Sequence, residues 1–172
     1  ALARAAGSGL VFGTPEARAL RRHPALAFDV NGSGQALVLS EDGALRAIPL
    51  QGGGELGVQE PLSIAPAARQ AKLAYYQPGR AIAVWMESAL TVDEALAAAD
   101  DYPILSRNQR VAWATFDGES WGTKQFLTDP GTGSGHPTLV ACPDWEAGCP
   151  AGGEVFLAWQ QNESGNPFQP RY

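Results

Sequence analysis

The feature that most constrains this chain is a pair of short apolar segments joined by a turn, which occurs three times. The first segments are 26–29, 73–76 and 139–142, and the second segments are 35–39, 81–85 and 155–159. Short runs rich in Val, Ile, Leu and aromatic residues, bounded by turn-forming residues, are typical of β-strands. The pattern therefore predicts three β-hairpins.

A second pattern lies between the hairpins, where a large apolar residue precedes glycine just after a glycine-containing turn. It occurs at Phe12-Gly13, Leu56-Gly57 and Trp121-Gly122, and we expect a strand at 11–14, 55–58 and 120–123. The glycines are 44 and 65 residues apart, and the hairpins begin 47 and 66 residues apart. In both series the second spacing is longer than the first by a similar amount, so a single insertion at roughly residues 89–107 explains both. Before its last strand, the middle unit also has a β-branched and aromatic run at 110–116, which predicts a third strand.

The repeating unit is thus four antiparallel strands in about 45 residues, which is the composition of a β-propeller blade. We expect an all-β fold, a propeller segment over residues 1–172, with a sandwich of similar hairpins as the alternative. The predicted divisions are a half blade at 1–22, a blade at 23–66, a blade at 67–131 that holds the insertion, and a half blade at 132–172. Three blades' worth of strands are too few to close a ring. We expect either a piece of a larger propeller or a chain that closes a ring with a second copy.

Two segments resemble known propeller repeats. The order Phe116-Asp117-Gly118, Trp121-Gly122, His136-Pro137 and Ala158-Trp159 resembles the degenerate repeats of sialidase-like (BNR-type) bacterial exoproteins. The segment from Asp29 to Gly34 resembles a repeat of the FG-GAP type, whose loop binds calcium. The sialidase Asp-box, Ser-x-Asp-x-Gly-x-Thr-Trp, is absent from the sequence. The resemblance implies a propeller without implying catalysis.

The turn of the first hairpin is a candidate calcium site. Asp29, Asn31 and Ser33 place three side-chain oxygens at alternating positions, as in the first half of an EF-hand loop. The bidentate carboxylate of such a loop is missing, because its position is occupied by Ser40. The alternative is a purely structural turn, since Asn-Gly favours tight hairpins and Asp favours turn starts.

The insertion predicts a short helix that could contact a ligand. Thr91 and Glu94 have the spacing of a capping box, an alanine-rich segment follows, and the sequence before Pro103 predicts the end of the helix. In an up-and-down blade this helix shares an end with the connection 128–135. The candidate contact residues are Asp93, Glu94, Asp100, Asp101 and Tyr102. The alternative is an ordinary solvated helix surface.

The charge and the cysteine content limit the possible binding partners of the chain and the cellular compartment in which it works. The chain has 12 basic and 18 acidic side chains and a net charge of −6, without the concentrated basic face that nucleic acid requires. Its apolar runs are too short to span a bilayer. Cys142 and Cys149 lie seven residues apart, which predicts either a local disulfide or two free thiols. A disulfide would indicate an oxidising, extracytoplasmic location, meaning secreted, periplasmic or on the cell surface.

The sequence offers little support for an enzyme. Sialidase chemistry would need an arginine cluster and a tyrosine, and Arg80, Arg107 and Arg110 with Tyr75 or Tyr76 have no spacing that singles them out. His23 and His136 both precede proline at the start of a hairpin, which favours a structural role. Of the five tryptophans, Trp85, Trp121 and Trp159 occupy repeat positions and are expected to pack, which leaves Trp113 and Trp145 free for other roles.

We therefore expect a non-catalytic propeller segment for recognition, adhesion or assembly. Its partners would be a protein or a glycan at a propeller face, together with further blades of a longer chain or a second copy. The alternatives are a fragment of a sialidase-like glycoside hydrolase and a purely structural subunit of a surface complex. No cofactor is predicted apart from the possible calcium ion.

Overall fold

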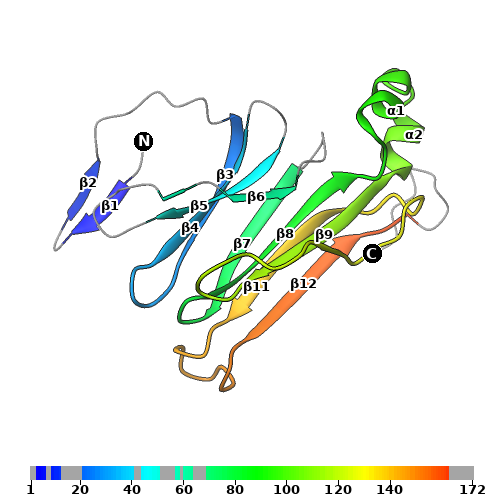
Figure 1. Cartoon of the computed structure of the whole chain (residues 1–172). Helices are drawn as coiled ribbons and strands as arrows, with labels where there is room; N and C mark the ends of the chain where they lie inside the picture. The colour runs from blue at the N-terminus through cyan, green and yellow to red at the C-terminus, as the bar shows by residue number, and fades with distance from the viewer. Residues whose placement is uncertain are drawn as a thin grey trace.

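The computed structural model describes residues 3–6, 9–12, 21–40, 44–50, 57–58, 60–63 and 69–162. Nearly all of the regular structure in these residues is antiparallel β-sheet, which confirms the all-β class (Figure 1). Two four-stranded sheets and two hairpins account for all twelve described strands. Within the described part of the chain the sheets form an open stack and no closed ring.

The first four-stranded sheet is a meander in sequence order. Its strands are β3 (Arg21–Phe28), β4 (Gly34–Leu39), β5 (Leu45–Leu50) and β6 (Glu60–Ser63). The β4–β5 register pairs Gly34 with Leu50 and Leu39 with Leu45. Because side chains alternate along a strand, this register places Leu37, Leu45 and Ala47 on one face and Ala36, Val38 and Ile48 on the other.

The second four-stranded sheet is a longer meander that carries the insertion. Its strands are β7 (Arg69–Gln77), β8 (Arg80–Ser88), β9 (Gln109–Phe116) and β10 (Gln125–Phe126). Strand β9 coincides with the predicted third strand of this unit. The connection from β8 to β9 contains two helices, α1 (Val92–Ala97) and α2 (Tyr102–Arg107), where the sequence predicted one.

Two hairpins complete the described structure. Strands β11 (Gly135–Cys142) and β12 (Glu154–Gln160) form the third predicted hairpin. Strands β1 (Ala3–Ala6) and β2 (Gly9–Phe12) form a hairpin near the N-terminus. All three hairpins predicted from the apolar segments are therefore confirmed, as β3–β4, β7–β8 and β11–β12.

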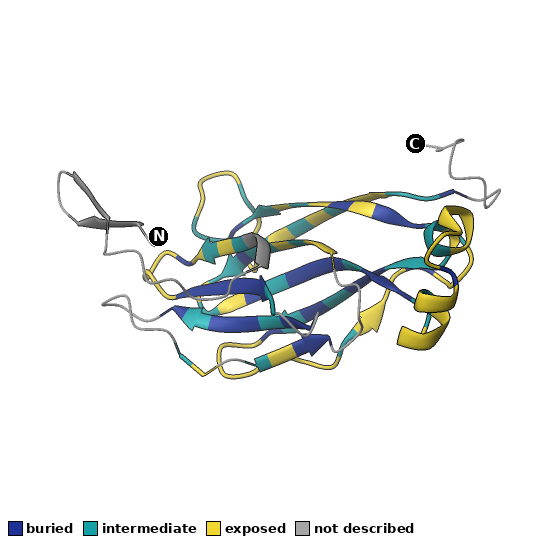
Figure 2. Ribbon diagram, turned by 90° about the horizontal axis from the view of Figure 1, so that it is seen from above, coloured by how far each residue is buried: buried dark blue, intermediate teal, exposed yellow. Residues whose placement is uncertain are grey.

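The three units stack face to face with their first strands adjacent. Strand β7 lies between β3 on one side and β11 on the other (Figure 1). The main core fills the space between the two four-stranded sheets, and the buried positions concentrate on their central strands (Figure 2). The core is formed by Leu37, Leu45, Ala47, Leu62, Tyr75, Ala81, Ala83, Trp85, Ala112, Ala114, Phe116 and Trp121. Many of its members are alanines, which let two sheets approach closely around a few large side chains.

The fourth strand of each full unit begins later than the sequence predicted. It was expected at 55–58 and 120–123, whereas the structure has β6 at Glu60–Ser63 and β10 at Gln125–Phe126. Residues 55 and 56 lie outside the described residues. In the two full units the apolar-Gly step therefore comes just before the fourth strand, although Trp121 already pairs with Phe116 in an isolated antiparallel bridge.

The apolar-Gly pattern instead marks a hydrogen bond that closes the turn after the third strand. The Gly57 amide donates to the Pro49 carbonyl at 2.8 Å, and the Gly122 amide donates to the Thr115 carbonyl at 2.8 Å. A Cβ at position 57 would lie 2.9 Å from the Pro49 side chain, so glycine is needed there. The repeat detected in the sequence is thus a repeat of backbone geometry.

A second backbone feature recurs at the start of the first strands. Gln70 of β7 and His136 of β11 both have φ of +52°, and each lies where the pairing with the next strand shifts register. Their side chains are hydrogen-bonded to each other at 3.2 Å. The pairing of β3 with β4 shifts between Arg21 and Ala25, at the corresponding place. A structural role for His136 agrees with this recurrence.

The Cys142–Cys149 disulfide is present, with a Cα–Cα distance of 5.4 Å. It closes the loop between β11 and β12, and Trp145 of that loop packs against the main core. Sequence analysis left Trp145 free for another role, and the structure assigns it to packing.

No helix in the described residues is long and apolar enough to cross a membrane.

Removing the disulfide should destabilise the third hairpin. The double variant Cys142→Ser, Cys149→Ser should lose about 2–3 kcal/mol of unfolding free energy, because a closed loop of this length restricts the unfolded chain. Urea denaturation of the two proteins measures the difference. Equal stabilities, or free thiols detected by mass tagging in the native protein, would contradict the expectation.

Candidate functional site

Helix α1 begins as the sequence predicted. The Thr91 hydroxyl oxygen accepts from the Glu94 amide at 3.3 Å, and a Glu94 carboxylate oxygen accepts from the Thr91 amide at 2.8 Å. This reciprocal pair is the predicted capping box. The hydrogen bonds from the Thr91 amide and hydroxyl lower the pKa of Glu94. The carboxylate of Glu94 is therefore committed to holding the start of the helix.

Helix α2 was missed by the sequence analysis, which treated the segment before Pro103 only as the end of a helix. The Asp101 side chain accepts from the Ile104 amide at 3.1 Å, so it caps a second helix. Pro103 lies in the first turn of that helix, where its missing N–H costs nothing. An Asp two residues before Pro is itself a helix-start signal that could have predicted α2.

The insertion is fixed to the sheet by backbone hydrogen bonds. The Ala89 amide donates to the Asn108 carbonyl at 2.7 Å, which closes the base of the insertion. The Gly133 amide donates to the Arg107 carbonyl at 3.0 Å. The connection 128–135 therefore lies beside α2, as the blade topology predicted.

All five candidate contact residues of the insertion are exposed: Asp93, Glu94, Asp100, Asp101 and Tyr102. Large apolar side chains are exposed among them, namely Val92, Leu96, Tyr102 and Ile104, with Leu96 69% accessible. We call the residues of these two sets the insertion surface. It combines carboxylates with apolar groups, which suits a partner that is both basic and apolar.

The first hairpin uses Asp29 as a structural tie between the two sheets. One Asp29 carboxylate oxygen accepts from the Asn31 and Ser33 amides, both at 2.9 Å. The other accepts from the Gly79 amide in the β7–β8 turn, also at 2.9 Å. The side chain is buried, so these bonds are sheltered from water. Asp29 therefore stabilises its own turn and links it to the next hairpin. We call these three hydrogen bonds the Asp29 clasp.

Calcium at Asp29, Asn31 and Ser33 stays a prediction. A carboxylate has about four lone-pair sites, and N–H groups already occupy three of those of Asp29. A cation would have to share these oxygens with N–H donors. Among the described residues, no group of three or more His, Cys, Asp or Glu side chains is placed to hold a metal ion.

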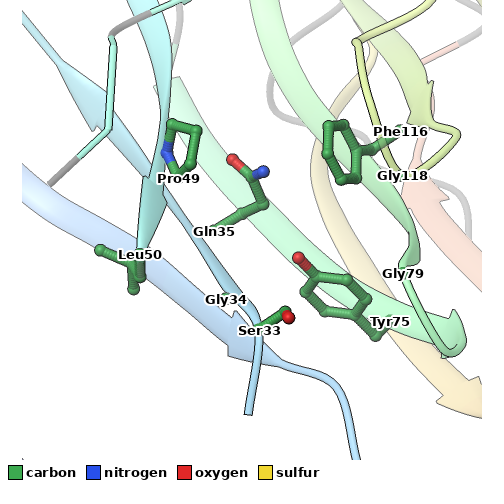
Figure 3. Close-up of a pocket in the computed structure, with 9 residues that line it drawn as sticks. All are labelled: Ser33, Gly34, Gln35, Pro49, Leu50, Tyr75, Gly79, Phe116 and Gly118. Carbon is green, nitrogen blue, oxygen red and sulfur yellow. The ribbon is translucent and has the colours of Figure 1, made fainter. Parts of the chain in front are cut away.

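A pocket of about 320 Å³ opens beside this clasp, between the hairpin ends of the two sheets. Its walls come from β4 and β5 on one side and from the β7–β8 and β9–β10 turns on the other (Figure 3). The residues that line it include Gln35, Pro49, Leu50, Tyr75, Gly79 and Phe116. It lies at the opposite end of the sheets from the insertion. At the pocket end of β8 and β9, Ala81 pairs with Phe116, and at the insertion end, Ser88 pairs with Gln109.

Gln35 is the unusual residue of the pocket. It belongs to the same row of β4 as Leu37 and Leu39, which face the main core. Only 2% of it is exposed, and its side-chain oxygen has no hydrogen-bond partner within the described structure. Leaving a buried polar group unpaired costs about 1–3 kcal/mol. An apolar side chain would fit this row at lower cost.

Tyr75 lies across the pocket from Gln35, and its hydroxyl points toward the amide (Figure 3). Burial, together with the negative charge of Asp29, raises the pKa of Tyr75 to about 12. The phenol is neutral at physiological pH, as an unperturbed tyrosine also is, and it can both donate and accept a hydrogen bond.

A buried carboxylate that the sequence analysis missed lies at the insertion end of the same interface. Glu87 is 1% exposed and accepts from the Ser63 hydroxyl at 2.7 Å and from the Trp85 indole at 2.9 Å. Its other oxygen accepts from the Lys124 ammonium at 2.9 Å, and the Arg110 guanidinium lies 3.9 Å away. The sequence does contain a signal for it, because Glu87 places an acidic side chain in a row of β8 that is otherwise apolar, namely Ala81, Ala83 and Trp85.

The arginines considered for sialidase chemistry do not form a cluster. Arg80 lies at the β7–β8 turn and Arg107 at the end of α2, at opposite ends of the sheet. Arg110 stacks over the Phe126 ring at 3.6 Å and faces Glu87. This arrangement gives no support to the hydrolase alternative.

Substitution of Asp29 tests the clasp, and Asp117 provides a matched control. Asp117 also caps a turn, accepting from the Glu119 and Ser120 amides, but it is exposed and within the described structure makes no bond to the other sheet. Asp29→Ala should lower the unfolding free energy by about 2–3 kcal/mol, because it leaves sheltered N–H groups unpaired. Asp117→Ala should lower it less.

Thermal melts of both variants measure this difference, and equal losses would contradict the clasp. The same melts in calcium and in chelator test the metal prediction. A calcium-dependent rise in Tm that Asp29→Ala abolishes would support the ion, and identical curves would exclude it.

Tyr75 should make the fold sensitive to alkali. Its folded-state pKa lies above that of the unfolded chain, so the unfolded state loses its proton first and stability falls as the pH rises from about 10 to 12. The loss is at most about 3 kcal/mol. Urea titrations at pH 9 and pH 11 should show a smaller decline for Tyr75→Phe than for the native chain. A decline of the same size in both would contradict the assignment.

The comparisons with known proteins add no family to this description. No family model, curated protein or solved structure matches the chain. The resemblance to sialidase-like and FG-GAP repeats therefore depends on the sequence motifs alone, and it stays a prediction.

Proposed function

We propose that this chain is a non-catalytic segment of an extracytoplasmic β-propeller that serves recognition, adhesion or assembly, and that the insertion surface is its protein-binding face. The observation that carries the proposal is the insertion itself. Two short helices, tied to a rigid sheet by backbone hydrogen bonds, present large apolar side chains to solvent. Functional contacts concentrate on such loops, because the scaffold positions them without being altered by them.

The order and stacking of the sheets support the propeller part of the proposal. Each full unit is a four-stranded meander, and the first strands β3, β7 and β11 lie next to one another. In a propeller the first strand of each blade lies nearest the axis, so first strands meet while the later strands spread outward. The contacts of β7 with both β3 and β11 fit the first part of that arrangement.

The open face of the third hairpin also supports continuation of the stack. Val140 and Phe156 are paired across β11 and β12 and are 59% and 60% exposed. On β7, Ala74 occupies the position that corresponds to Val140, and it is half-buried. An apolar face of this kind is expected to be covered by a further sheet.

The disulfide supports the extracytoplasmic location. Cys142 and Cys149 are bridged, and no described cysteine is free. Structural disulfides form and persist mainly in oxidising compartments. A secreted, periplasmic or surface-exposed protein fits this chemistry.

The charge of the insertion surface indicates the kind of protein partner. Asp93, Asp100 and Asp101 carry negative charge beside the exposed Leu96 and Tyr102. A partner with Lys or Arg around an apolar centre would complement both properties. Attraction between exposed charges is weakened by salt, so binding should fall as ionic strength rises.

A site-specific photo-crosslinker tests this face. The probe is introduced at Leu96 or Tyr102 of the full chain, in the cells that make the protein. We expect a cross-linked product at both positions, and we expect its yield to fall at high salt and in the variant Asp100→Asn, Asp101→Ser. The serine at the second of these positions keeps a side chain that can cap α2, so the helix is retained while the charge is removed.

The control places the same probe at Glu154, which is exposed on β12 at the far end of the sheets from the insertion. This position should give no product. Equal yields at all three positions, or no product at Leu96 and Tyr102, would contradict the insertion surface as the binding face.

A further inference from the structure

We propose that Asn31 is an N-glycosylation site, at which an oligosaccharide is attached to the side-chain amide after the chain has left the cytoplasm. The site is the turn between β3 and β4, at the end of the sheets away from the insertion helices (Figure 1). The inference rests on the proposed extracytoplasmic location. It goes beyond the proposed function, because it assigns a covalent modification to a turn that the insertion surface does not use.

The sequence of the turn is the first observation. Asn31, Gly32 and Ser33 form the acceptor pattern Asn-x-Ser, in which the middle residue is not proline. The asparagine amide receives the sugar, and the transferase requires the hydroxyl two residues later. Sites of this kind that are used lie in surface loops of secreted proteins, so the structural context of the pattern decides whether it is an acceptor.

The same pattern occurs once more in the chain, and the structure distinguishes the two copies. The second copy is Asn162, followed by Glu163 and Ser164. Asn162 is 7% exposed, and its main-chain amide donates to the Thr132 carbonyl at 3.1 Å. A Cβ at Gly133 would lie 3.5 Å from the Asn162 Cβ, so other residues crowd this side chain. An oligosaccharide on Asn162 would not fit the folded structure.

Asn31 has the opposite surroundings. Asn31, Gly32 and Ser33 are all exposed. Gly32 has φ of +80°, and no residue beyond its chain neighbours lies within 4 Å of the place that a Cβ would take. The main-chain N–H of Asn31 donates to the Asp29 carboxylate, while the Asn31 carboxamide makes no hydrogen bond within the described structure. The turn therefore presents this asparagine to solvent, where a bulky glycan can be accommodated.

Two exposed apolar side chains beside the acceptor fit the same assignment. Phe28 and Val30 flank Asp29 and are 53% and 58% exposed. Large apolar groups at a surface favour cover by another group. A sugar attached to Asn31 would lie next to them, and its C–H face can pack on an aromatic or aliphatic side chain.

The reaction replaces the leaving group at the anomeric carbon of the donor, which is an oligosaccharide linked to a lipid through pyrophosphate. The Asn31 Nδ2 atom forms a bond to the anomeric carbon, and the bond between that carbon and the pyrophosphate oxygen breaks. The lipid pyrophosphate leaves with the electron pair, and the amide nitrogen loses one proton. Nothing is oxidised or reduced, so the lipid-linked donor is the only co-reactant.

The order in which the chain emerges allows the modification before the turn is locked. The Asp29 clasp includes the Gly79 amide, and Gly79 is 48 residues further along the chain than Asn31. At synthesis rates of roughly 5–20 residues per second, the clasp cannot close until about 2–10 s after Asn31 has been made. During that interval the acceptor segment can bind a transferase in an extended conformation. Asp29 then offers a carboxylate two residues before the acceptor, which a basic side chain of the transferase can bind.

Peptide mapping by mass spectrometry, on the full chain isolated from the cells that make it, tests the proposal. The peptide that contains Asn31 should carry the added mass of an oligosaccharide, identified by its sugar fragment ions, and the peptide that contains Asn162 should be unmodified. Asn31→Gln and Ser33→Ala should each abolish the added mass, because they remove the acceptor and the required hydroxyl. Ser33→Thr is the matched control, and it should keep the added mass because the hydroxyl is retained.

The same map shows whether Cys142 and Cys149 are bridged, which separates failure of this site from failure of the proposed location. A bridged chain without added mass at Asn31 would overturn the glycosylation site and leave the extracytoplasmic location intact. Free thiols without added mass would overturn both. Added mass that Ser33→Ala retains, or that is found on Asn162, would also contradict the assignment.

Discussion

The close approach of the two four-stranded sheets is the constraint on which the rest of the structure depends. Strand β8 turns Ala81 and Ala83 toward the first sheet, and both are completely buried. Side chains this small leave the space that Trp85 and Leu37 then fill. Dense packing of this kind has few tolerated rearrangements, because an added methyl group would force the sheets apart and a removed one would leave a void. The apolar interface thus sets the distance and the register at which every polar contact between the sheets must form.

The polar contacts are found at the two ends of this interface. At one end, Asp29 accepts an amide hydrogen from Gly79 of the neighbouring sheet. At the other, Glu87 accepts from Ser63 of the first sheet and is neutralised by Lys124. A buried carboxylate is tolerated only when its charge and its lone pairs are matched, so neither residue can be exchanged freely. Gln35 differs from both, because it is equally buried and its oxygen lacks a partner in the described residues.

Sequence reasoning worked best where the determining contacts are local. The three hairpins, the capping box of Thr91 and Glu94 and the Cys142–Cys149 bridge all depend on residues close together in the chain, and all three were predicted. The fourth strands were misplaced, because the apolar-Gly step closes a turn and the strand follows it. Glu87, the Asp29 clasp and the pocket depend on residues from different sheets, and nothing in the local sequence indicates which strands face each other. Closure into a propeller would depend on more units than the described chain contains, so the propeller stays a proposal.

The two polar ends have a mechanical consequence. Gly79 lies directly before β8, and Glu87 lies near the end of β8, eight residues later, which corresponds to about 26 Å of extended strand. A sheet pinned at two points this far apart cannot slide along its neighbour unless both anchors break together, and it cannot pivot about either one. This pair of sheets is therefore built to withstand shear along the strand direction.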